Sequence, residues 1–103
     1  MDLQITDEPD ERAYVARDED GEVGRAVYRL RGDLIAFMHT ETDDRVQGRG
    51  VGSDLVRAAL DDARAKGLKV LPFCPFVQHV MEQAPEYADL VPEEYRAKFG
   101  LAS

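Results

Sequence analysis

Hydrophobic and polar positions divide the chain into a first half rich in strands and a second half with helical periodicity. Three segments in the first half are rich in β-branched and aromatic residues: residues 13–17, 23–30 and 34–42. Turn signals at residues 20–21 and 31–33 separate them, which predicts an antiparallel meander of three strands. Leu3 and Ile5 alternate with polar residues near the N-terminus, so a further strand or a frayed end is expected there.

The second half has the spacing of amphipathic helices on either side of one more strand. Apolar residues recur every three to four positions over residues 53–66, and Gly67 follows as a helix-ending residue. Residues 68–73 are typical of a strand, which together with the preceding strand and helix predicts a βαβ unit with parallel strands. A second helix is expected over residues 75–84 and a short terminal helix over residues 92–99.

The third predicted strand, residues 34–42, changes character along its length. Simple alternation places Ile35, Phe37, His39 and Glu41 on one face. Because both faces are apolar over the first half, we expect a central strand that is covered on both sides. His39 and Glu41 then lie near the carboxyl end of the strand, where we expect the active site.

A glycine loop, residues 47–53 (QGRGVGS), joins this strand to the first helix. Glycines let a ligand approach the backbone and permit positive φ, and a helix N-terminus favours an anion. A nucleotide P-loop needs a Lys after its last Gly, and a dinucleotide loop needs G-x-G-x-x-G; neither pattern is present. The spacing instead fits Q/R-x-x-G-x-G/A, so the loop is predicted to bind an anion.

This loop with its flanking strand and helix resembles the acyl-CoA pyrophosphate loop of the GNAT superfamily of N-acetyltransferases. The predicted element order over residues 13–91 is similar to a minimal GNAT fold. That fold is α/β (α+β), with a mixed, mostly antiparallel sheet, helices on both faces and a central splay for acetyl-CoA. Residues 39–41 and 74–76 resemble the small single-domain YjdJ-like branch. We therefore expect a single acyltransferase domain over residues 1–103.

The resemblance implies that backbone amides of the glycine loop hold the CoA pyrophosphate and that residues 40–42 pair with the pantetheine arm. The implied cofactor-binding residues are Thr40, Thr42, Arg45, Gln47, Gly48, Arg49, Gly50, Val51, Gly52, Ser53 and Cys74. Typical members carry an Asn and, seven residues later, a Tyr that protonates the leaving thiolate. Cys74 and Met81 occupy these positions here. The usual general acid is therefore absent. Either another residue such as Tyr87 replaces it, or the protein has no general acid.

Three residues are candidates for the chemistry of acetyl transfer. Glu41 is the first candidate for the base, directly or through a water, and His39 could serve instead because histidine is a common general base. Cys74 starts a helix, where a thiolate is stabilised. It is expected either to contact the thiol arm of the cofactor or to accept the acyl group covalently. Each residue also has a plainer interpretation. Glu41 would be an exposed carboxylate, His39 a histidine with its hydrogen bonds satisfied within the sheet, and Cys74 a small buried hydrophobic residue. Phe37, Phe73, Phe76 and Tyr28 are expected in the core.

Composition limits the partners and the compartment. A formal net charge of −8 argues against binding to nucleic acid or to an anionic membrane, and it is compatible with a cationic amine substrate. One cysteine and two histidines predict neither a disulfide nor a metal site. The acidic N-terminus lacks the apolar core of a secretory signal, so a cytoplasmic protein is expected. A monomer and a homodimer both remain open.

Three functions follow from these patterns. The leading one is an acetyl-CoA-dependent N-acetyltransferase that acts on a small amine or a protein lysine. The alternative is an acyl-CoA-binding module without turnover, with a regulatory or partner-binding role. In the third, the glycine loop is only a connector. Binding of CoA separates the third function from the other two, and thiol release separates the first from the second.

Overall fold

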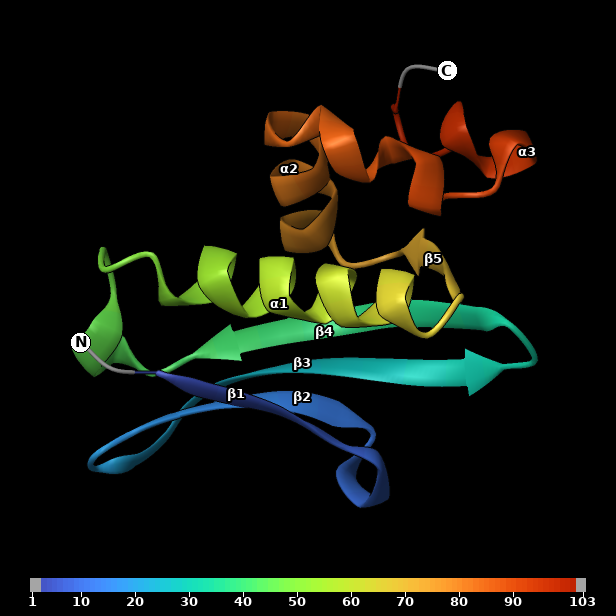
Figure 1. Ribbon diagram of the computed structural model, residues 1–103. Helices are drawn as coiled ribbons and strands as arrows, with labels where there is room; N and C mark the ends of the chain where they lie inside the picture. Colours follow the sequence, from blue (N-terminus) through green and yellow to red (C-terminus); the bar gives the residue numbers. More distant parts are fainter. Residues whose placement is uncertain (1–2, 102–103) are drawn as a thin grey trace.

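A single mixed sheet with strand order β1-β2-β3-β4-β5 organises the computed structural model, which describes residues 3–101 (Figure 1). The strands are β1 (Gln4–Glu8), β2 (Ala13–Asp18), β3 (Gly21–Arg31), β4 (Leu34–Thr42) and β5 (Lys69–Pro72). The helices are α1 (Val51–Ala65), α2 (Pro75–Gln83) and α3 (Glu93–Arg96), with 3-10 helices at Pro9–Glu11, Asp44–Val46 and Pro85–Leu90. β1 to β4 are antiparallel neighbours and β5 is parallel to β4, so the predicted fold class is confirmed.

The acidic N-terminal segment forms a true strand, so the meander has one strand more than the three expected. β1 pairs with β2 along its whole length. Ile5 lies opposite Ala16 and packs against the core beside it, and this apolar contact stabilises the pairing. The local pattern allowed either a strand or a frayed end, and pairing with β2 makes this segment a strand.

α1 contributes six buried residues to the core. Its fully buried side chains face the sheet and the segment after α2: Leu55, Ala59, Leu60 and Ala63. Gly67, with a φ of 72°, then turns the chain back into β5. This completes the predicted βαβ unit. Within residues 3–101, no helix is long and apolar enough to cross a membrane.

α1 covers one face of β1 to β4, whereas α2 and α3 lie toward the β5 side of the sheet (Figure 1). The single crossover from β4 to β5 places α1 on one face. The following segment then packs on α1: the Tyr87 hydroxyl donates to Asp61 at 2.8 Å, and Arg64 pairs with Asp89 at 2.9 Å. The opposite face of β1 to β4, called the open face below, carries polar side chains, and Met38 of β4 is 41% exposed.

A β-bulge at Met38 reverses the side-chain alternation of β4. Tyr28 pairs with Phe37 while its neighbour Val27 pairs with His39, so Met38 has no partner on β3. Phe37 is buried on the α1 side. After the bulge His39 turns to the open face. The prediction that His39 and Glu41 share a face with Ile35 and Phe37 is therefore wrong.

β4 and β5 separate halfway along β4 and form the predicted splay. β5 pairs only with residues 34–37 of β4. Pro72 ends β5 without an N–H to donate. The last bond across the gap runs from the Cys74 N–H to the Phe37 carbonyl at 2.9 Å. Among the described residues, residues 38–42 have no strand neighbour on the β5 side, so an extended backbone edge is open there.

Candidate functional site

The glycine loop turns through two left-handed residues before α1 begins. Gly48 and Gly50 have φ of 79° and 76°. This region is costly for residues with a Cβ, so glycine is needed at both positions. Gly50 is the N-cap of α1, and it has no side chain to cap the helix. The first turn of α1 is therefore left with unpaired N–H groups that point into the loop.

Several loop amides have no acceptor within the described residues: those of Gly48, Gly50, Val51, Gly52 and Ser53. The amides of Gln47 and Arg49 differ, because they donate to the carbonyls of Asp44 and Val46 at 3.2 Å each. Unpaired amides at the positive end of a helix dipole are the usual partners of a phosphate. The loop therefore fits the anion that the sequence predicts.

A groove of about 310 Å³, called the loop groove, lies between the glycine loop, the end of β4 and the start of α2. It is lined by Thr40, Thr42, Val46, Gln47, Gly48, Gly50, Val51, Gly52, Ser53 and Phe76. The groove thus brings most of the predicted cofactor-binding residues together. Phe76 was expected in the core and is instead 37% exposed, and Phe73 is 42% exposed. No pattern in the sequence distinguishes these exposed aromatic residues from the buried Phe37.

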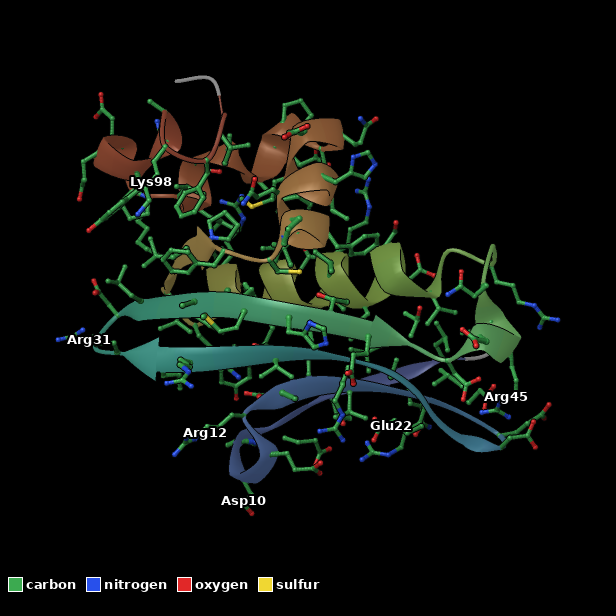
Figure 2. All side chains as sticks on the ribbon, turned by 180° about the vertical axis from the view of Figure 1, so that it is seen from behind. Asp10, Arg12, Glu22, Arg31, Arg45 and Lys98 are labelled. Carbon is green, nitrogen blue, oxygen red and sulfur yellow. The ribbon has the colours of Figure 1, made fainter. Side chains whose placement is uncertain are left out.

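Three predicted cofactor-binding residues do not line the loop groove. Arg45 lies in the 3-10 helix that follows β4 (Figure 2), where its Nε donates to Asp43 at 3.1 Å and this bond raises the pKa of Arg45. Arg49 is exposed on the loop outside the groove lining. Cys74 is 4% exposed, and its Sγ lies 3.3 Å from the Thr40 hydroxyl. The thiol is therefore not part of the groove surface, but it contacts Thr40, which is.

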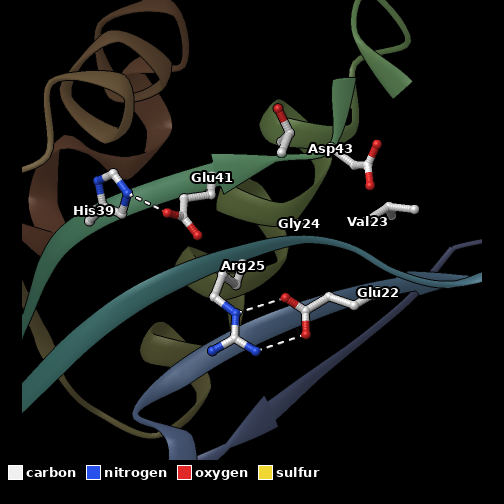
Figure 3. A pocket seen from close by; sticks show the side chains of 8 residues that line it. Glu22, Val23, Gly24, Arg25, His39, Glu41 and Asp43 are labelled. Atoms are coloured by element: carbon white, nitrogen blue, oxygen red, sulfur yellow. Dashed lines mark hydrogen bonds and ion pairs between the residues drawn. The ribbon is translucent and has the colours of Figure 1, made fainter. Parts of the chain in front are cut away.

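A second groove of about 480 Å³ lies on the open face and is called the open-face groove. It is lined by Glu22, Val23, Gly24, Arg25, His39, Glu41, Thr42 and Asp43. His39 Nε2 and Glu41 Oε1 are 3.0 Å apart along its edge (Figure 3). Arg25 donates to Glu22 at 2.8 Å, which lowers the pKa of Glu22. Thr42 lines both grooves, so β4 forms the wall between them.

Tyr87, the candidate for the general acid, does not donate into these grooves. The Tyr87 hydroxyl donates to Asp61 on α1, and burial together with this bond raises the pKa of Tyr87. Tyr87 lines neither groove. Met81, at the position of the usual tyrosine, is 1% exposed in the core. The suggestion that Tyr87 replaces the usual acid is therefore wrong for this structure.

Known proteins resemble the chain in both sequence and fold. A protein of Staphylococcus aureus, solved by NMR and described as GCN5-like, aligns with a TM-score of 0.67 and 29% identity over 87% of this chain and 88% of its own. The ribosomal-protein-S18-alanine N-acetyltransferase of Escherichia coli shares the fold, with a TM-score of 0.60 and 15% identity over 71% of this chain and 52% of its own.

Protein NATD1 of Gallus gallus is 33% identical over 52 residues, which is 50% of this chain and 47% of NATD1. The match thus spans about half the length of this curated relative. The finer assignment to the YjdJ-like branch stays a prediction. A family model described as GCN5-related N-acetyl-transferase matches residues 12–90, which include β2 to β5, the glycine loop and α2. The chain belongs to the GCN5-related N-acetyltransferase family.

Proposed function

We propose that this chain transfers the acetyl group of acetyl-CoA to an amine, either on a small molecule or on a protein lysine. The observation that carries the proposal is the row of loop amides that have no acceptor within residues 3–101, next to the open edge of β4. Phosphate oxygens only accept hydrogen bonds, and an extended arm with amide groups can pair with a strand edge. Acetyl-CoA joins both features in one molecule, and its thioester supplies the activated acetyl group.

Each part of the loop groove has a role in this proposal. The amides of Gly48, Gly50, Val51, Gly52 and Ser53 hold the pyrophosphate, and the backbone at Thr40 and Thr42 pairs with the arm. Cys74 packs behind Thr40 and supports the inner end of the groove. Because its thiol is 4% exposed, we favour this supporting role over a covalent acyl acceptor, which needs an accessible thiolate.

The His39–Glu41 pair is our candidate for removing the proton of the attacking amine. When Nε2 of His39 donates to Glu41, Nδ1 is left free to accept a proton, and Glu41 stabilises the imidazolium that results. The amine nitrogen bonds to the acetyl carbon as the carbon–sulfur bond breaks. The electron pair of that bond leaves with the CoA sulfur.

The open-face groove favours a cationic acceptor. Three carboxylates line it, those of Glu22, Glu41 and Asp43. Arg25 is the only Lys or Arg among its lining residues, and its guanidinium is paired with Glu22 and Glu11 at 2.8 Å. The groove therefore has excess negative charge, which attracts a protonated amine before the proton is removed.

Isothermal titration with acetyl-CoA tests the cofactor, with Gly50→Glu as the variant. We expect the parent to bind and the variant not to, because a carboxylate in the glycine loop repels phosphate. An amine panel then compares the parent with His39→Ala and Glu41→Gln. We expect turnover to fall by roughly 10²-fold or more with unchanged affinity for acetyl-CoA. A parent that is folded by circular dichroism and does not bind acetyl-CoA would refute the proposal.

One observation favours a second function, an acyl-CoA-binding module without turnover. No tyrosine among the residues that line the two grooves is available to protonate the leaving thiolate. Such a module would bind acetyl-CoA as tightly as the enzyme. Release of free thiol with any amine of the panel would exclude it, whereas binding without thiol release would support it.

A further inference from the structure

Phe76 has no role in the function proposed above, although its ring lies in the loop groove. The buried face of α2 is formed by Val77, Val80 and Met81. Phe76 lies outside this stripe, is 37% exposed and lines the groove beside the free amides. Single exposed apolar residues are common on protein surfaces. Phe76 differs from exposed Leu30 in that its ring lines the same groove as the unpaired loop amides.

The ring packs directly on the third glycine of the loop. A Cβ added to Gly52 would lie 2.9 Å from Cζ of Phe76 and 3.5 Å from Cγ2 of Thr42. Gly52 is in the helix and is not among the glycines with positive φ, so its backbone conformation does not require glycine. Glycine is required because the Phe76 ring occupies the space that a side chain at position 52 would take. The glycine at position 52 therefore allows α2 to pack closely against the first turn of α1.

This contact brings an aromatic ring into the lining of the loop groove. The ring contacts Gly52, one of the residues with a free amide, and the Cβ position of Gly52 also lies 3.5 Å from Cγ2 of Thr42 on β4. A ligand that reaches from the amides to Thr40 passes this ring. The exposed part of the ring is an apolar surface of the kind that methylene groups cover favourably.

We propose that Phe76 is a positioning residue whose ring forms the wall on which the pantetheine arm of CoA packs. The inference rests on the proposed function, because it needs CoA to be the ligand. The ring orients the arm toward Thr40 and leaves the pyrophosphate contacts to the loop amides. Loss of the ring therefore weakens binding of the arm and leaves binding of the nucleotide portion unchanged.

The test compares two ligands by isothermal titration: CoA, and 3′-phospho-ADP, which keeps the pyrophosphate and lacks the arm. For Phe76→Ala we expect CoA to bind about tenfold more weakly or worse, and the affinity for 3′-phospho-ADP to stay within about twofold. Phe76→Leu keeps apolar bulk and should recover part of the CoA affinity. It also carries the comparison if the alanine variant does not fold.

Phe73→Ala is the matched control, because Phe73 is as exposed as Phe76 and lines neither groove. This variant should bind both ligands like the parent. Equal losses for the two ligands in Phe76→Ala would overturn the inference, since they would mean that the ring shapes the loop. So would unchanged CoA affinity. A parent that binds neither ligand would overturn the proposed function itself, whereas a parent that binds CoA without dependence on Phe76 overturns only this inference.

Discussion

The contact between Gly52 and Phe76 predicts a substitution whose sign depends on a residue in another helix. In Gly52→Ala two effects oppose each other. Alanine is favoured over glycine within a helix by up to about 1 kcal/mol. The new Cβ would lie 2.9 Å from the Phe76 ring, and overpacking of this kind costs about 1–3 kcal/mol. We expect Gly52→Ala to lower the free energy of unfolding by about 0–3 kcal/mol in the parent, the difference of the two.

Without the ring, only the helix preference remains. In a Phe76→Ala background, Gly52→Ala should therefore raise the free energy of unfolding by up to about 1 kcal/mol. Urea denaturation of the parent, the two single variants and the double variant, followed by circular dichroism, measures the coupling. We expect about 1–3 kcal/mol. An effect of Gly52→Ala that is the same in both backgrounds, within about 0.5 kcal/mol, would refute the reasoning.

Gly50→Ala is the control for this cycle. Gly50 has positive φ and nothing within 4 Å of its Cβ position, so strain is the only expected effect. A left-handed alanine costs about 1–2 kcal/mol whatever occupies position 76. Coupling between positions 50 and 76 would show that the ring acts through the whole loop, and the steric account of Gly52 would then fail.

Three further predictions concern the fold. Leu60 is fully buried and Leu30 is 57% exposed. In urea denaturation, Leu60→Ala should lower the free energy of unfolding by about 2–5 kcal/mol and Leu30→Ala by about 0.5 kcal/mol or less. Equal losses for the two variants would contradict the assigned core. A Cβ on Gly24 would lie 3.1 Å from the Glu41 carbonyl, so Gly24→Ala should lower the melting temperature, and an unchanged melting temperature would argue against this close approach of β3 and β4. Burial raises the pKa of Asp62, but hydrogen bonds from Lys66 and Tyr14 outweigh it and lower the pKa, so its stabilisation is present above about pH 4 and is lost as the pH falls further. Unfolding free energies from about pH 5 to 3 should therefore decline less steeply in Asp62→Asn than in the parent, and identical slopes would exclude this contribution.

The local patterns of the sequence determined the order of the elements and the place of the glycine loop. Residues 34–42 and 53–66 were recognisable because strand and helix periods depend on near neighbours. Gly48 and Gly50 were recognisable because a tight turn into a helix needs positive φ at particular positions. The loop, its strand and its helix were enough to indicate the family, since they are adjacent in the chain.

Tertiary structure alone decided how the candidate site is divided. One unpaired residue, Met38, turns His39 to the open face, and this depends on the register with β3, which alternation along a single strand does not specify. The same holds for Phe76. Its sequence context resembles that of a core aromatic residue, and only the packing of α2 against Gly52 leaves it lining a groove. Sequence patterns describe near neighbours, whereas these two features arise from contacts between segments distant in the chain.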